Sequence, residues 1–182
     1  MAVSTTQALL LVDGYNIIGA WSSLKKTRDR HGLELARQEL VETLINYTTH
    51  QGFEAQIVFD SQYQKTPSSQ ENYTPTLSVH YTAFAQTADT YIEKICASFF
   101  RQYTSLPSRL IVATSDRAQR LTVVGYGAEW MSAQQLATEV ETSASQVRKK
   151  QHSKQQSQSR FLFNSLDAKV QQRLAQWRKG LD

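Results

Sequence analysis

Short apolar runs recur along the chain, each bounded by polar or turn-forming residues. Three of them, Ala8–Asp13, residues 55–60 and residues 109–114, are mostly apolar, as expected of strands covered on both faces in a parallel sheet. Residues 77–84 begin with alternating apolar and polar side chains, and residues 128–131 form a short run after two glycines. All of these segments are predicted to be strands.

Between the strands, apolar residues three and four positions apart predict helices. Leu33–Gln51 shows this spacing, and Gly52 is placed to end that helix. A second helix is expected over about residues 90–103, where Thr90 and Glu93 have the spacing of a capping box.

Two more helices are expected, one after Asp116 through Val123 and one from Ser132 to about Lys150. The alternation of strands and helices predicts a three-layer α/β domain with a mostly parallel central sheet. We assign this domain to residues 1–147.

Three segments lack a strong pattern. Residues 61–75 are polar, contain two prolines and are expected to form an exposed, mobile loop. Residues 152–159 are polar and low in complexity, which predicts a linker or a frayed helix end. Residues 167–179 are weakly amphipathic, as in a short helix. Residues 148–182 are therefore predicted to be a helical C-terminal extension.

Charge is distributed unevenly between the two parts. The chain has a formal net charge of +4, but residues 148–182 contain nine Lys or Arg and two Asp or Glu, so the first 147 residues have a net charge of −3. A basic extension favours a polyanionic partner, although a solvated helix kept soluble by its charges would have the same composition. The candidate contacts to such a partner are Arg148, Lys149, Lys150, Lys154 and Arg160.

Several classes of protein are disfavoured. Cys96 is the only cysteine, so neither an internal disulfide nor a cysteine-built zinc site is expected. No segment has the roughly 18 consecutive apolar residues of a membrane-spanning helix, and the first residues lack the features of a secretory signal. We expect a cytoplasmic protein without a membrane partner.

Acidic residues stand at the ends of the predicted strands. Asp13, Asp60 and Asp116 end or closely follow three of them, and Asp89 lies near the helix start after residues 77–84. The carboxyl ends of parallel strands open on one edge of a sheet, so these carboxylates are expected to converge in one crevice. Like charges repel unless a cation neutralises them, and oxygen ligands without His or Cys favour Mg²⁺ or Mn²⁺. Such a site suits phosphoryl chemistry.

Each acid also has a purely structural interpretation. Asp13 precedes a glycine and could form a turn, and Asp89 or Asp116 could stabilise a helix start. Asp60 borders the predicted loop and is the weakest candidate of the four. Glu93 lies one helical turn after Asp89 and could ligate a metal, orient a ligand or belong to a cap.

Polar and aromatic neighbours of these acids are further candidates. Asn16 could orient a water or hold the first loop by side-chain-to-backbone bonds. Ser115 could donate a hydrogen bond to phosphate or support Asp116. Tyr15 and Trp21, in the loop expected after the first strand, could stack on a base or pack that loop onto the core.

Several motifs occur in order along the chain. They are residues 11–21 (LVDGYNIIGAW), 58–60 (VFD), 87–89 (TAD) with 92–94 (IEK), 113–116 (ATSD) and 177–180 (WRKG). Together they resemble the NYN-domain family of PIN-like nucleases, specifically its YacP-type branch, over nearly the whole chain. The resemblance implies a PIN-like α/β fold and an activity like that of ribosome-associated endonucleases that cut messenger RNA.

The resemblance also implies roles for individual residues. Asp13, Asp89 and Asp116 match the family's metal-binding acids, Asn16 matches its associated asparagine, and Asp60 matches a further acid. The leading hypothesis is therefore an endoribonuclease that uses Mg²⁺ or Mn²⁺ to hydrolyse RNA, leaving 5′-phosphate and 3′-hydroxyl ends.

Three alternatives have different signatures. A metal-free nuclease that uses the ribose 2′-hydroxyl would need paired acid–base groups, commonly histidines. This class is disfavoured, because the histidines at 31, 50, 80 and 152 are scattered and lie outside the motifs. A non-catalytic RNA- or ribosome-binding adaptor would have no use for the acids. A small-molecule phosphohydrolase would have no evident use for the basic extension.

Overall fold

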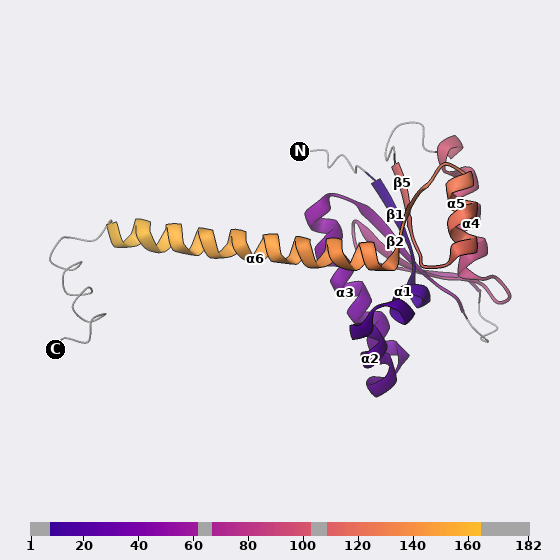
Figure 1. Ribbon diagram of the computed structural model, residues 1–182, viewed down its shortest axis with the longest axis horizontal. Coiled ribbons are helices and arrows are strands. Elements are labelled where there is room, and N and C mark those ends of the chain that lie inside the picture. The colour runs from indigo at the N-terminus through magenta and orange to yellow at the C-terminus, as the bar shows by residue number, and fades with distance from the viewer. Residues whose placement is uncertain (1–7, 62–66, 103–108, 165–182) are drawn as a thin grey trace. The chain divides into compact units, whose positions relative to one another are not determined.

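The computed structural model describes residues 8–61, 67–102 and 109–164, and its contacts divide the chain into two units, residues 1–141 and 142–182. The first unit is built on one sheet, with helices packed beside its strands (Figure 1). The six strands of this sheet are in the order β3-β4-β2-β1-β5-β6. Only the β3–β4 pair is antiparallel, which confirms the mostly parallel sheet. The strands are β1 (Ala8–Asp13), β2 (Glu54–Phe59), β3 (Ser69–Thr74), β4 (Leu77–Tyr81), β5 (Arg109–Ala113) and β6 (Glu129–Met131).

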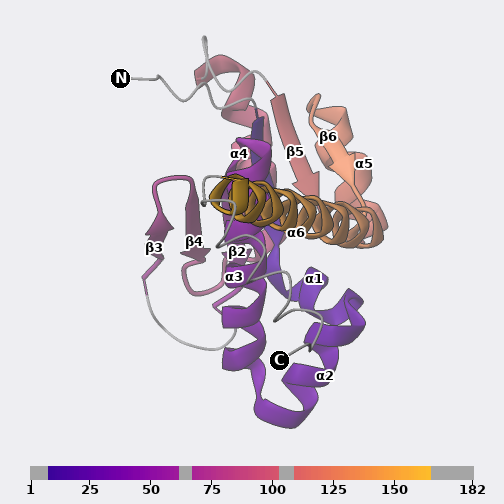
Figure 2. The same ribbon diagram turned by 90° about the vertical axis from the view of Figure 1, so that its left-hand side faces the viewer.

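Helices pack on both faces of the sheet, as the predicted three-layer architecture requires (Figure 2). One core cluster takes its helical residues from α1, α2, α3 and the first turns of α6, and the cluster on the other face takes them from α4 and α5. The helices are α1 (Gly14–Ala20), α2 (Ser22–His31), α3 (Leu33–Gln51), α4 (Ala88–Gln102), α5 (Arg117–Gly125) and α6 (Ala133–Asn164).

The apolar run of β1 is explained by this double cover. Leu10 and Val12 belong to the core cluster with Leu40 of α3, whereas Leu11 belongs to the opposite cluster with Ile92 of α4. Because successive side chains of a strand point to opposite faces, a strand between two helical layers must be apolar at every position.

Two predicted helix boundaries are confirmed by their caps. Gly52 ends α3 in the left-handed conformation, with φ 70° and ψ 31°, and its N–H donates to the carbonyl of Thr48. Ser132 precedes α6, and its hydroxyl accepts a hydrogen bond of 3.1 Å from the backbone N–H of Gln135. Glycine adopts the first conformation without steric cost, and serine provides the oxygen that the first turn lacks.

The prediction of a loop after β1 is wrong, because the chain enters α1 directly and continues into α2. The spacing of apolar residues did not predict either helix, because both are short and bury few side chains. In α2 only Leu24 is buried. The remaining residues of α2 are polar, so its sequence shows no apolar stripe.

The prediction of a loop over residues 61–75 is also wrong in part, because β3 occupies Ser69–Thr74. β3 is the edge strand of the sheet, and five of its six residues are exposed. A strand with polar residues on both faces has no apolar alternation, so only its pairing with β4 defines it. The strand predicted over residues 77–84 ends earlier, at Tyr81.

Two predictions about helix ends need correction. α4 begins at Ala88, with the Thr87 hydroxyl accepting from the backbone N–H of Thr90, so Thr90 is not the cap. Residues 152–159, predicted to be a linker or a frayed helix end, are helical and not a linker, because α6 continues to Asn164. Its Gln, Lys and Arg residues favour helix, and it has no Gly or Pro to stop it. The helix predicted over residues 167–179 lies outside the described residues.

Among the described residues, no helix is both long and apolar enough to cross a lipid bilayer.

The start of α1 is packed against an aromatic stack. The fully buried ring of Phe59 lies between those of Tyr15 and Tyr81, with centroid separations of 5.0 and 5.8 Å. Gly14 lies so close to the Phe59 ring that an added Cβ would overlap it, whereas a Cβ at Gly19 would meet no atom within 4 Å.

We therefore expect Gly14→Ala to lower the free energy of unfolding by about 1–3 kcal/mol, because a packed core resists an added methyl group. Gly19→Ala, in the same helix, should be neutral or stabilise by about 0.5–1 kcal/mol. Chemical denaturation of both variants measures the difference, and equal effects would show that the Phe59 ring moves aside freely.

Candidate active site

Asp13 connects the central strand to the first helix. It is the last residue of β1 and the N-cap of α1, and its Oδ1 accepts a hydrogen bond of 3.1 Å from the backbone N–H of Asn16. The residue is buried, and burial raises the pKa of its carboxyl from 3.8 to about 6. The Asn16 N–H opposes this shift, and the nearby carboxylates of Asp89, Asp116 and Asp60 add to it.

Asp116 and Asp89 are connected by a residue that the sequence did not single out. Asp116 is the N-cap of α5, and its Oδ1 accepts from the backbone N–H groups of Ala118 and Gln119, at 2.6 and 3.1 Å. The Gln119 side chain is buried, and its Nε2 donates to Asp89 Oδ1 at 2.6 Å. Gln119 thus fixes the carboxylate on α4 relative to the one that starts α5.

Asn16 connects the segments that follow β1 and β5. Its Oδ1 accepts a hydrogen bond of 2.7 Å from the backbone N–H of Ser115, ninety-nine positions along the chain. The predicted alternative of a side-chain-to-backbone bond is therefore observed, although the partner is the distant Ser115 segment. The bond positions the residue directly before Asp116, which makes Asn16 a positioning residue.

Asp60 and Glu93 complete the acidic surface. Asp60 directly follows β2, and its charge contributes to the raised pKa of both Asp13 and Asp89. Burial makes the largest contribution to the raised pKa of Asp89, and the charges of Asp116, Glu93 and Asp60 raise it further. The structure thus brings together all four predicted aspartates, with Glu93 one turn along α4.

The donor chemistry of this cluster fits a hard divalent cation. Its groups are carboxylates, and among the described residues none of the groups that shift the pKa of Asp13 or Asp89 is a cation. Gln119 adds a buried amide oxygen that has no hydrogen-bond partner in the structure. Clustered carboxylates repel one another, so a cation would lower the energy of the folded state.

The carboxylates are not arranged as a preformed coordination shell. Within the described part of the chain, no group of three or more His, Cys, Asp or Glu side chains is positioned to hold one metal ion. In each of Asp13, Asp89 and Asp116, one carboxylate oxygen already accepts a hydrogen bond from another group of the protein. Ligation would therefore require small side-chain rotations or intervening waters, as is common for Mg²⁺.

The aromatic candidates after β1 pack into the protein. Trp21 is buried, and its Nε1 donates to the carbonyl of Ala133 at 2.7 Å, so it is not a base-stacking residue. Tyr15 contacts Phe59, and its hydroxyl accepts from Arg37 Nη1 at 3.0 Å. The packing alternative is thus the observed one for both.

The basic candidates lie on α6. Arg148, Lys149 and Lys150 are exposed in the second unit. Lys154 and Arg160 lie further along the same helix, in a part for which the structure describes the backbone only.

Gln119 is the functional candidate that sequence analysis missed. Its signal was present, because it lies three residues after the helix-starting Asp116, where an amide side chain commonly belongs to a capping arrangement. Its bond to Asp89, thirty positions away, follows only from the packing of α4 beside α5.

The raised pKa of Asp13 predicts a pH-dependent stability in metal-free solution. The folded state binds a proton at Asp13 more tightly than the unfolded state, so the stabilisation contributed by this group is fully present below pH 3.8 and is lost as the pH rises through 6. Asp13→Asn retains a good N-cap and cannot ionise. We expect it to gain on the order of 1–3 kcal/mol relative to wild type between pH 4 and 7. Denaturant unfolding in EDTA measures this, and a pH-independent difference would contradict it.

Comparisons with known proteins identify the family of this chain. Residues 10–179 match the family model described as the YacP-like NYN domain. YacP of Bacillus subtilis (strain 168) is 32% identical over 173 residues, which cover 94% of this chain and 97% of that protein.

Two crystal structures of Rae1 (YacP) from Bacillus subtilis have the same fold. One superposes with a TM-score of 0.66 at 31% identity, covering 94% of this chain and 95% of that one. The other, of a mutant of the same protein, gives a TM-score of 0.67 at 27% identity, covering 92% and 98%. The chain therefore belongs to the YacP-like NYN family, a family of nuclease-like proteins.

Proposed function

We propose that this protein is a divalent-metal-dependent endoribonuclease that hydrolyses RNA, with messenger RNA on the ribosome as its substrate in the cytoplasm. One observation carries the proposal. Carboxylates from four separate segments, Asp13, Asp60, Asp89 and Asp116, act on one another electrostatically without a neutralising cation among them.

In this proposal Asp13, Asp89 and Asp116 hold Mg²⁺ or Mn²⁺, and Asp60 and Glu93 extend the acidic surface around them. When bound, the cation supplies Lewis-acid activation of water and charge stabilisation on the phosphate. A carboxylate cluster without a cation would repel the phosphodiester, so substrate binding and metal binding are coupled.

The protein's own residues fix the geometry of these acids. Gln119 holds Asp89 through its Nε2, and the first turn of α5 holds Asp116. Asn16 holds the Ser115 backbone and thereby the start of the segment that leads to Asp116. Positioning of this kind contributes to catalysis because it limits the movement that the acids must make when the metal and the substrate bind.

The basic stretch of α6 supplies affinity for the polyanion. Arg148, Lys149 and Lys150 are consecutive exposed cations, and Lys154 and Arg160 follow in the same helix. Phosphate contacts of this kind strengthen binding without selecting sequence. We assign this stretch to the RNA or the ribosome.

RNA cleavage by the purified protein, with and without ribosomes, tests the activity. Products with 5′-phosphate ends are expected in Mg²⁺ or Mn²⁺ and not in EDTA. Asp13→Asn/Asp89→Asn should reduce cleavage to the level of buffer, because two of the three ligands lose their charge.

Asp29→Asn is the matched control, because Asp29 is an exposed acid on α2 that pairs with Arg28. It should cleave like wild type. Equal residual cleavage in the double variant would identify a contaminating nuclease. RNA binding without cleavage under any condition would favour the non-catalytic adaptor.

Charge reversal tests the role of α6. We expect Arg148→Glu/Lys149→Glu/Lys150→Glu to weaken RNA or ribosome binding and to reduce the slope of log K against log salt by about 2, as for three lost phosphate contacts on a single strand. Lys25→Glu/Lys26→Glu/Arg30→Glu reverses three exposed charges on α2 and should have a smaller effect. Fluorescence anisotropy over a range of salt measures both, and identical slopes would remove this role from α6.

A further inference from the structure

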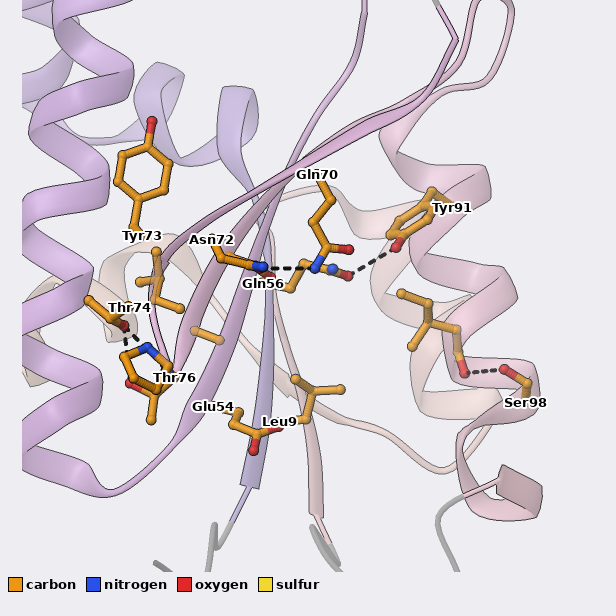
Figure 3. Close-up of a pocket in the computed structure, with 15 residues that line it drawn as sticks. Leu9, Glu54, Gln56, Gln70, Asn72, Tyr73, Thr74, Thr76, Tyr91 and Ser98 are labelled. Carbon is orange, nitrogen blue, oxygen red and sulfur yellow. Dashed lines mark hydrogen bonds between the residues drawn. The ribbon is translucent and has the colours of Figure 1, made fainter.

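A groove of about 730 Å³ lies on the sheet face that carries α4, beside the β3–β4 hairpin (Figure 3). Its wall on one side is α4, with Tyr91, Ile95 and Ser98, and its floor and other wall come from β2, β3 and β4. No function proposed above uses it.

The groove follows from uneven helical cover. The core cluster on this face includes β1, β2 and β5 residues but none from β3 or β4, so the hairpin extends beyond the helical layer. Asn72 of β3 and Gln56 of β2 both pair in register with Ser78 of β4, and residues paired in register project from the same face. Leu77 and Val79 point to the α3 side, where they are buried in the other cluster.

The exposed lining is polar but almost without charge. Gln70 Nε2 donates to Asn72 Oδ1 at 3.2 Å, and the Tyr91 hydroxyl donates to Gln56 Oε1 at 3.1 Å (Figure 3). Among the described residues that line the groove, Glu54 is the one that is charged, and none is Lys or Arg. Amides carry a donor and an acceptor, as base edges do, whereas a phosphate site would require cations.

α4 runs from the acid cluster along one wall of the groove. Asp89 lies in the first turn of this helix, and Tyr91, Ile95 and Ser98 follow along it. At about 1.5 Å per residue the helix advances roughly 13 Å from Asp89 to Ser98. The Tyr91 ring stacks on His80, with centroids 3.9 Å apart, which fixes the end of the groove nearest Asp89.

We propose that this groove binds the bases of one or two unpaired nucleotides next to the bond cut at the acid cluster, and so gives the enzyme a sequence preference. The proposal rests on the proposed ribonuclease function. Sequence-specific RNA recognition generally reads unstacked bases in single strands, through hydrogen bonds to their edges. The groove volume lies within the roughly 300–1,000 Å³ typical of sites for small organic ligands.

Binding is tested first without catalysis. The full-length, ¹⁵N-labelled Asp13→Asn/Asp89→Asn variant, which should not cleave RNA, is titrated in Mg²⁺ with a single-stranded RNA hexamer of mixed sequence and with an abasic strand of the same length. The side-chain NH₂ resonances of Gln56, Gln70 and Asn72 should shift with the hexamer and not with the abasic strand. If the hexamer leaves them in place, the groove does not bind RNA and the proposal is wrong.

Variants on the two faces of β3 separate base recognition from folding. Gln70→Ala/Asn72→Ala should weaken hexamer binding about tenfold, as expected for two lost hydrogen bonds. Gln70→Glu/Asn72→Asp keeps the side-chain shapes and should weaken it at least as much. Ser69→Ala alters the same strand at the position paired with Tyr81, on the opposite face, and should bind like wild type. Equal affinity in all variants would overturn the proposal.

Cleavage distinguishes the two proposals from each other. In Mg²⁺, abasic nucleotides next to the cleaved bond should lower kcat/KM for wild type about tenfold and have little effect in Gln70→Ala/Asn72→Ala. Cleavage that ignores base identity in wild type would leave the nuclease standing and refute the groove. Base-dependent shifts without any cleavage would leave the groove standing and refute the nuclease.

Discussion

Holding several carboxylates together at one edge of the sheet is the constraint on which this structure depends. Burial and mutual repulsion disfavour ionisation, and the raised pKa of Asp13 shows both. The fold offsets the cost with hydrogen bonds. Asp13 and Asp116 accept from the first turns of α1 and α5, and Gln119 donates to Asp89. The same bonds start the helices and orient the acids, so a structural role of these residues is compatible with the metal-binding role that we propose for them.

The way in which helices cover the two faces of the sheet explains which side chains of the β3–β4 hairpin are buried and which line a groove. On one face, the core cluster with α1, α2 and α3 reaches out to β4, so Leu77 and Val79 are buried. On the other, α4 and α5 leave the β3–β4 hairpin open, and the side chains there are amides and hydroxyls. α4 therefore has two roles, with Asp89 at its start and a groove wall along its length. A site for chemistry and a surface for recognition can share one rigid element in this way.

Much of the fold follows from local patterns. The buried strands and α3 were predictable because the apolar residues of an element record which of its faces are buried. α1 was not, because its seven residues are too few to show a helical period. α2 and β3 were not, because they bury few side chains and carry mainly polar residues. Likewise, the polar segment of α6 resembles a linker in composition, although each of its residues tolerates a helix. The spacing of apolar residues therefore does not predict an element that buries few side chains.

The sequence by itself determined that acids stand at strand ends and helix starts, since strand and helix boundaries are local properties. Only the tertiary structure decided which groups meet. The bonds from Ser115 to Asn16 and from Gln119 to Asp89 span ninety-nine and thirty positions, and the groove joins β2, the hairpin and α4. Such contacts depend on strand order and on the packing of helices across the sheet, and a linear pattern of polar and apolar residues carries neither.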